Sequence, residues 1–110
     1  MPFNEETAHR IRTLTKSLED NFSEKKMFGG LSFMYKGKMA IGVVGDKLAV
    51  RILREKYEEH LKRAFVSPMT FTGKSMKEFL YVESKAFQSE SELSYWIDLG
   101  IEHAEFKLNS

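Results

Sequence analysis

Apolar and polar side chains alternate in three successive stretches between residues 31 and 52, which is the pattern of half-buried β-strands. Two short breaks separate the stretches, Lys36–Gly37–Lys38 and Gly45–Asp46, and breaks of this kind connect antiparallel neighbours. We therefore predict a three-stranded antiparallel meander. Its apolar members are Leu31, Phe33 and Tyr35, then Met39, Ile41 and Val43, and finally Leu48, Val50 and Ile52.

The lengths of the two breaks predict the register of these strands. A two-residue turn at Gly45–Asp46 places the apolar side chains of both flanking strands on one face. It pairs Val43 with Leu48, Ile41 with Val50, and Met39 with Ile52.

The first break predicts a different loop. A two-residue turn at Lys36–Gly37 would put Phe33 on the face opposite Ile41. A three-residue loop, with Gly37 left-handed in a bulge, restores the pairing of Phe33 with Ile41 and of Leu31 with Val43. We predict that loop; the alternative is a sheet that is covered on both faces.

Helical spacing of apolar residues occurs on both sides of the meander. Residues 4–22 form one such stretch, with Asn4 as its N-cap. Residues 53–65 form another, which Pro68 stops. In this second helix His60 falls among the charged residues of the predicted outer surface.

The end of the chain carries the clearest helix pattern. Ser89 and Glu92 have the spacing of a capping box before an apolar run. Gly100, one turn after Trp96, predicts the closest contact of this helix with another backbone. Between the second and last helices, residues 69–83 predict a short hairpin around Gly73–Lys74.

These elements predict one domain over residues 1–110, because a chain of 110 residues has room for a single core. The fold class is α+β: an antiparallel β-meander plus a short hairpin, packed against the N-terminal and C-terminal helices.

Composition narrows the class of protein. The chain has 17 basic and 16 acidic residues, a net charge of +1 and no cysteine. This interleaved charge does not favour a dedicated nucleic-acid or membrane-surface binder, and disulfides and thiolate metal sites are excluded. No apolar segment reaches the length of a membrane span or of a secretory signal. We expect a cytoplasmic protein that does not contact a membrane.

Candidate chemistry is sparse. The three histidines, His9, His60 and His103, have no second ligand at a metal-binding spacing. We expect His103 on the surface of the last helix, at the edge of its apolar face. No serine lies in a nucleophile elbow. We therefore expect no catalytic residue, no metal, no cofactor and no enzymatic activity.

Two stretches remain as candidate sites. The entry to the meander, Met27–Phe28–Gly29–Gly30, is interpreted as a structural bend or bulge, with a small-ligand or enzymatic pocket beside Gly29–Gly30 as the alternative. Lysines interleave with aromatic residues around the meander, and such a rim could bind nucleic acid. The lysines concerned are Lys25, Lys26, Lys36, Lys38 and Lys47.

An ordered series of short motifs resembles the N-terminal domain of TfoX/Sxy proteins. It runs from Lys26–Met27–Phe28–Gly29–Gly30 through Gly37–Lys38–Met39 and Asp46–Lys47–Leu48 to Met69–Thr70–Phe71, residues 77–82, and residues 93–104. The resemblance covers nearly the whole chain. It implies an α+β domain with an antiparallel sheet, which agrees with the pattern above.

The resemblance also implies a role. Named members of the family regulate natural competence in bacteria together with a transcription activator of the cyclic-AMP type, and they carry a helical C-terminal domain. This chain resembles the stand-alone versions without that domain. We expect a regulatory or protein-interaction module whose partner is another protein, with a transcription regulator and a second copy of the chain as candidates. Direct nucleic-acid binding by the lysine rim is the alternative.

Overall fold

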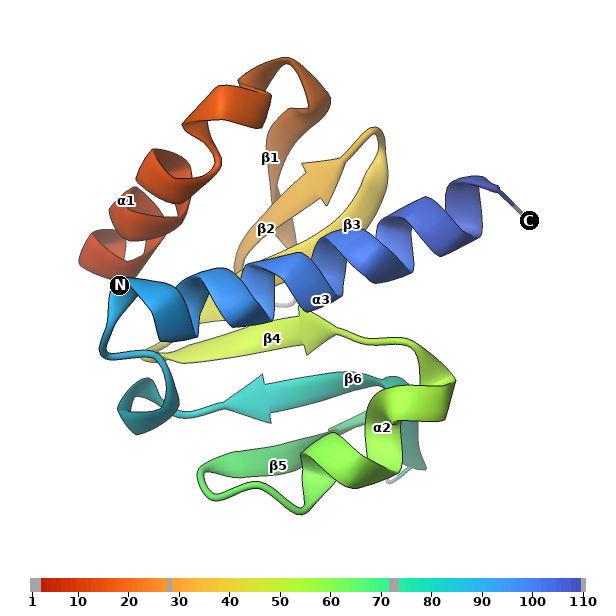
Figure 1. Ribbon diagram of the computed structural model, residues 1–110. Coiled ribbons are helices and arrows are strands. Elements are labelled where there is room, and N and C mark those ends of the chain that lie inside the picture. The colour runs from red at the N-terminus through yellow and green to blue at the C-terminus, as the bar shows by residue number, and fades with distance from the viewer. Residues whose placement is uncertain (1–2, 28, 72–73, 110) are drawn as a thin grey trace.

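A six-stranded antiparallel sheet forms the centre of the molecule (Figure 1). The computed structural model describes residues 3–27, 29–71 and 74–109. The strand order is β1-β2-β3-β4-β6-β5. The strands are β1 Phe22–Met27, β2 Gly30–Tyr35, β3 Lys38–Val44, β4 Lys47–Arg51, β5 Val66–Phe71 and β6 Lys74–Val82, and the α-helices are α1 Glu5–Leu14, α2 Arg54–Leu61 and α3 Glu90–Leu108. The predicted α+β class is confirmed.

The predicted turn between β3 and β4 is confirmed. Val43 pairs with Leu48 and Ile41 pairs with Val50 on either side of the two-residue turn Gly45–Asp46. The pairing of Met39 with Ile52 is wrong, because β4 ends at Arg51 and Met39 lies on the other face of the sheet, in a cluster with Ala49, Met69 and Phe79.

The β2–β3 hairpin reaches the predicted register by a different route. Phe33 pairs with Ile41 as predicted, but the loop has two residues, Lys36 and Gly37, with φ values of 50° and 86°. Positive φ at both positions is what a type I′ turn requires. The extra residue is Ala40, because Met34 pairs with Met39. The bulge therefore lies inside β3, and the predicted three-residue loop is wrong.

The first helix is shorter than predicted. Asn4 caps it, accepting a hydrogen bond from the Thr7 amide at 3.0 Å, but α1 ends at Leu14 rather than at residue 22. The Thr15 hydroxyl donates to the Ile11 carbonyl at 2.9 Å at this end. A 3₁₀ helix, Lys16–Asn21, and the edge strand β1 follow. Residues 23–26 of β1 are charged or polar and exposed, and such edge strands resist pairing with other chains. Because β1 shows no alternation of apolar residues, the sequence pattern does not predict it as a strand.

The double glycine forms the turn between β1 and β2. Met27 pairs with Gly30, and Gly29 has a φ of 74°; Phe28 lies outside the described residues. A Cβ atom on Gly30 would lie 2.1 Å from the carbonyl oxygen of Val43, so no larger residue fits there. The second glycine of the motif therefore has a structural role, because it lets β2 approach β3.

The second half of the chain extends the sheet. The predicted hairpin is present and joins the meander, because β6 pairs with β4 as well as with β5. Its turn at Gly73 lies outside the described residues. Pro68 lies within β5, an edge strand, where a missing amide hydrogen is tolerated. The helix before it, α2, ends at Leu61, four residues earlier than predicted.

The last helix lies across the sheet. Its capping box is confirmed, with Ser89 and Glu92 bonded reciprocally. Gly100 marks the predicted close contact: a Cβ atom there would lie 2.2 Å from the carbonyl oxygen of Ala40. Trp96 is buried and donates its indole N–H to the carbonyl of Ala86 at 3.1 Å.

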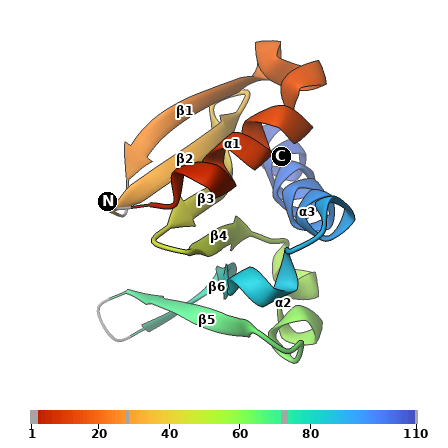
Figure 2. The same ribbon diagram turned by 90° about the vertical axis from the view of Figure 1, so that its left-hand side faces the viewer.

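The molecule has two layers. In Figure 2, α2 and α3 lie on one side of the strands, and no helix of the described residues lies on the opposite face of the sheet. The main core lies between the layers and includes Phe33, Leu80, Phe87 and Leu93. Within the part of the chain that the structure describes, no helix is long and apolar enough to cross a membrane.

Candidate functional site

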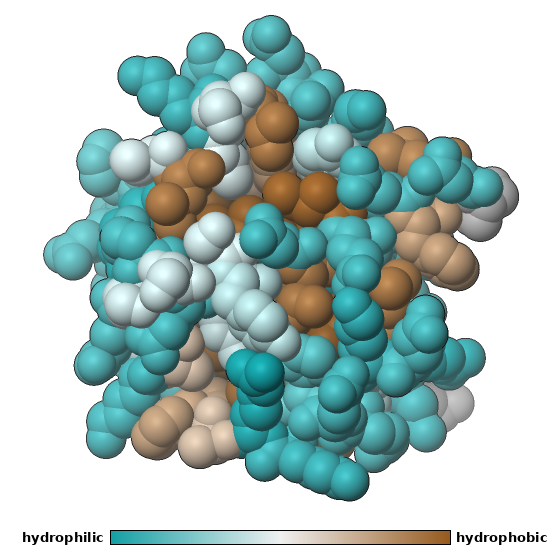
Figure 3. All heavy atoms as spheres, in the orientation of Figure 1, coloured by the Kyte–Doolittle hydropathy of each residue, from teal (hydrophilic) through white to brown (hydrophobic). Residues whose placement is uncertain are grey.

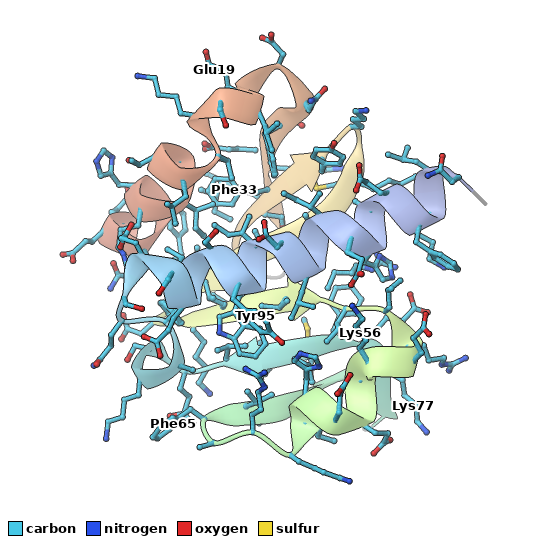
Figure 4. The ribbon with its side chains drawn as sticks, viewed as in Figure 1. Glu19, Phe33, Lys56, Phe65, Lys77 and Tyr95 are labelled. Atoms are coloured by element: carbon cyan, nitrogen blue, oxygen red, sulfur yellow. The ribbon has the colours of Figure 1, made fainter. Side chains whose placement is uncertain are left out.

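A groove lies between the N-terminal half of α3 and the chain segment that connects α2 to β5. Its volume is ≈ 410 Å³, which is in the range of about 300–1,000 Å³ that is common for ligand pockets. Figure 4 shows Tyr95 extending from α3 toward α2, and Phe65 near the start of β5. We call it the Phe65–Tyr95 groove. Its lining includes Arg63, Phe65, Lys85, Glu92, Tyr95 and Trp96.

Phe65 has a strained backbone. Its φ of 67° lies in the left-handed region, where a bulky side chain is an outlier and which costs an L-residue about 1–2 kcal/mol. Burial does not offset this cost, because Phe65 is 43% exposed. The carbonyl of Phe65 accepts a hydrogen bond from the Glu83 amide at 2.8 Å, which holds this conformation in place. Backbone strain of this kind is concentrated at functional sites.

Two partly exposed rings, Phe65 and Tyr95, line the groove. Tyr95 is 37% exposed, close to the value for Phe65. Figure 3 shows apolar surface at the lower left, where the connection between α2 and β5 lies in Figure 1, surrounded by hydrophilic residues. Apolar surface with a polar rim is typical of sites that bind another molecule.

Tyr95 is at the centre of a chain of hydrogen bonds. The Nδ1–H of His60 donates to the carbonyl of Lys56 at 2.8 Å, and in this tautomer Nε2 is an acceptor. The Tyr95 hydroxyl donates to this Nε2 and accepts a hydrogen bond from Nη2 of Arg63 at 3.1 Å. The chain orients the Tyr95 ring and joins it to a cation.

Two cations stand over the aromatic rings of the groove. The guanidinium carbon of Arg63 lies 4.7 Å from the centroid of Tyr95 and 5.8 Å from that of Trp96. The Lys85 ammonium lies 5.6 Å from the centroid of Phe65. Among the described residues, no ion pair joins either cation to a carboxylate. Their charges are therefore available to a ligand.

The one carboxylate in the lining is committed elsewhere. Glu92 accepts hydrogen bonds from the amide and the hydroxyl of Ser89, at 3.0 and 2.9 Å. Both bonds lower the pKa of Glu92, and the bond from the backbone amide has the larger effect. Its charge stabilises the N-terminus of α3, and the lining as a whole carries two cations and this one carboxylate.

A second pocket, of ≈ 480 Å³, lies between the start of α2 and the C-terminal half of α3. Here Nε2 of His103 donates to Oε1 of Glu78 at 2.6 Å. Burial lowers the pKa of His103, and the hydrogen bond from His103 lowers the pKa of Glu78. The other ring nitrogen, Nδ1, is buried and has no hydrogen-bond partner among the described residues. A ligand in the pocket therefore cannot reach it, and the pair fastens α3 to β6.

The surface positions predicted for two histidines are wrong. His60 is 4% exposed and His103 is 1% exposed, because each finds a partner on another element, Tyr95 or Glu78. His9 is exposed, as expected for the outer face of α1. No group of three or more histidine or acidic side chains among the described residues could hold a metal ion.

The family model of the TfoX N-terminal domain matches residues 13–104 of the chain. The chain belongs to the TfoX N-terminal domain family. No curated protein and no solved structure matches it. The matched range includes both walls of the Phe65–Tyr95 groove and the pair of His103 with Glu78.

The lysines proposed as a nucleic-acid rim are distributed over this TfoX N-terminal domain. Lys25 and Lys26 lie on the edge strand β1, and Lys36 and Lys38 lie at the β2–β3 turn. Lys47 follows the β3–β4 turn, at the opposite end of β3. Lys36 and Lys47 stand over the rings of Tyr35 and Tyr81, each at 5.5 Å. Nucleic-acid binding by these lysines stays a prediction.

The glycine motif of the TfoX N-terminal domain turns between two strands and does not open a helix. Gly29 is exposed, with no atom within 4 Å of where its Cβ atom would be, whereas Gly30 is packed against β3. Neither glycine lines the groove or the His103 pocket. A pocket beside Gly29–Gly30 also stays a prediction.

The sequence prediction missed the groove, because its residues come from three separate segments. Arg63 and Phe65 follow α2, Lys85 lies in the 3₁₀ helix Ser84–Ala86, and Tyr95 lies on α3. The sequence predicts Phe65 as the last residue of the helix over residues 53–65, whereas α2 ends four residues earlier. The one local signal is Pro68, which excludes a helix shortly before it and so moves Phe65 into a connection.

Proposed function

We propose that this TfoX N-terminal domain is a non-enzymatic, regulatory protein-interaction module whose partner docks in the Phe65–Tyr95 groove. The observation that carries the proposal is Phe65, a bulky residue in a left-handed conformation that is 43% exposed. The fold sustains a backbone strain to present this ring to solvent, and aromatic rings with an adjacent arginine are the side chains that dominate binding energy at protein interfaces.

The arrangement of polar groups supports binding rather than catalysis. A general base needs an accessible lone pair within reach of a substrate proton. Behind Tyr95, both nitrogens of the buried His60 are used, one by the Lys56 carbonyl and one by the Tyr95 hydroxyl. These hydrogen bonds orient Tyr95, and a rigid aromatic side chain loses little entropy on binding.

The family supports a regulatory role. The resemblance of this chain to competence regulators favours a partner of the transcription-regulator class. The groove agrees with such a role, because its volume of ≈ 410 Å³ suits a few side chains of a partner that anchor a larger contact.

The test is a pull-down from a lysate of the source cells with three baits: the wild type, Phe65→Gly and Lys36→Gly. Phe65→Gly removes the ring and relieves the left-handed strain. Lys36→Gly is the matched control, because Lys36 is the other non-glycine residue with positive φ among those described, with a φ of 50°. We expect a partner to be retained by the wild type and the control and lost by Phe65→Gly.

Two results would contradict the proposal. One is equal retention of every captured protein by Phe65→Gly and the wild type. The other is a lysate from which no bait retains anything. Sedimentation of the purified chain identifies a second copy as the partner if wild type and Lys36→Gly dimerise and Phe65→Gly does not.

A further inference from the structure

The charges around the groove differ from those inside it. Arg63 and Lys85 lie inside, without a carboxylate partner among the described residues. The adjacent helices carry exposed carboxylates that no ion pair neutralises among the described residues: Glu58 and Glu59 on α2, and Asp98 on α3. Glu90 and Glu102 of α3 are paired with Arg10 and Lys56. The two cations of the groove thus lie between helices that each expose unpaired carboxylates.

This pattern separates two classes of anionic partner. A nucleic acid carries a phosphate at every nucleotide and is bound by a basic surface that follows its backbone. The unpaired carboxylates of Glu58, Glu59 and Asp98 on both sides of the groove would repel such a strand. A single carboxylate that enters the groove meets the two cations without lying along either helix.

The geometry of Arg63 suits a carboxylate. Its guanidinium carbon lies 4.7 Å from the Tyr95 centroid, and its one side-chain hydrogen bond among the described residues uses Nη2. A guanidinium has five N–H donors in a planar fork. The remaining donors can bind both oxygens of a carboxylate in a bidentate arrangement, which a lysine ammonium cannot form.

The rings of the groove specify the neighbour of that carboxylate. Phe65 and Tyr95 are 43% and 37% exposed, and they offer contact area to an apolar side chain within the same site as the two cations. Resting on the function proposed above, we infer that the groove binds a linear segment of another protein in which an aspartate or glutamate adjoins a large apolar residue.

The experiment selects peptides from a random display library on the immobilised wild-type chain, with counter-selection on Phe65→Gly. Selected peptides are then titrated by fluorescence anisotropy. We expect acidic residues next to leucine, phenylalanine or tryptophan to be enriched, and affinity to fall as salt rises. Lys85→Gln and Arg63→Gln should each weaken binding by about tenfold, the effect of losing one charge-assisted contact.

Lys62→Gln is the control for charge. Lys62 is exposed and adjacent to Arg63 in the chain, but it is not part of the groove lining. Its removal changes the net charge of the domain as much as the other two variants do. We expect it to leave peptide affinity within about twofold of the wild type.

The outcomes distinguish this inference from the proposed function. Peptides that require Phe65 but are basic or uncharged would overturn the acidic specificity and leave the docking function standing. A single-stranded oligonucleotide that binds in a Phe65-dependent manner would overturn the protein-segment inference. Peptides that bind Phe65→Gly as well as the wild type, or a selection without any binder, would contradict both.

Discussion

At the scale of single residues, the most unusual feature is the left-handed backbone of Phe65. An L-residue loses about 1–2 kcal/mol in this region because its Cβ atom crowds the following carbonyl. Glycine has no Cβ atom and avoids the penalty. The ring of Phe65 contributes little to the core because it is 43% exposed. The identity of the residue is therefore better explained by what it contacts outside the molecule than by folding.

This explanation predicts an unusual order of stabilities. Phe65→Gly should be more stable than Phe65→Ala by about 1 kcal/mol, because alanine keeps the crowded Cβ atom and glycine does not. At most positions outside the left-handed region the order is reversed. Urea unfolding of the two variants measures the difference directly. An alanine variant that is as stable as the glycine variant would show that the backbone of Phe65 is not left-handed.

A second residue-scale prediction concerns pH and the pair of His103 with Glu78. The pKa of Glu78 is lowered from 4.5, first by the hydrogen bond from His103, so its contribution is present above pH 4.5 and is lost as pH falls through the folded value. The pKa of His103 is lowered from 6.5, mainly by burial. As pH falls below 6.5, His103 is therefore protonated in the unfolded chain before it is protonated in the folded chain, and the free energy of unfolding decreases.

Thermal unfolding as a function of pH tests this pair. The wild type should be more stable than Glu78→Gln at pH above 6.5, and the gap should narrow as pH falls through 4.5. Glu105→Gln is the control, because Glu105 lies exposed on the same helix as His103. A constant gap between wild type and Glu78→Gln over the whole range would exclude the proposed linkage.

At the scale of elements, the fold depends on two backbone contacts that only glycine permits. Gly30 lets β2 approach the carbonyl of Val43, and Gly100 lets α3 approach the carbonyl of Ala40. Ala40 is also the extra residue of the β3 bulge, so α3 crosses the sheet at the point where β3 is irregular. The contact sets the position of α3, and α3 carries Tyr95 of the groove and His103 of the second pocket.

Gly100→Ala tests the approach of α3 to the sheet. Alanine would favour an isolated helix by about 1 kcal/mol, but its Cβ atom would lie 2.2 Å from the oxygen and 2.7 Å from the carbon of the Ala40 carbonyl. Backbone cannot move aside as a side chain can, so we expect a net destabilisation of about 1–3 kcal/mol in urea unfolding.

Asp98→Ala is the control for helix propensity, because Asp98 is exposed on α3, two residues earlier. Its effect should stay within about 0.5 kcal/mol. An unchanged or increased stability for Gly100→Ala would show that α3 does not lie this close to β3.

The same elements show what local sequence can predict. Alternation around Gly45–Asp46 was sufficient for the β3–β4 register, since pairing and burial agree there. Strand β1 was not predicted, because Phe22 continues the apolar spacing of α1 and the residues after it are exposed and charged. The burial of His103 depends on Glu78 from another element, and such a pair has no local pattern.

At the scale of the whole molecule, the two layers place the candidate site at one edge of the fold. The helices lie on one side of the sheet (Figure 2), and the groove opens where the α2–β5 connection meets α3. The sheet and the hydrogen bond between buried His60 and the Tyr95 hydroxyl hold the groove in shape. The family match covers residues 13–104 and so most of the fold. The groove has no such local signal, because its lining comes from segments that are separate in the sequence.

The most direct test of this account is the affinity of the retained partner for three purified chains, measured by isothermal titration calorimetry. We predict that Lys36→Gly binds like the wild type and that Phe65→Gly binds at least about tenfold more weakly, which corresponds to the loss of one aromatic anchor. Urea unfolding should show that both variants are folded. Equal affinity of Phe65→Gly and the wild type would contradict the central claim that partners dock in the Phe65–Tyr95 groove.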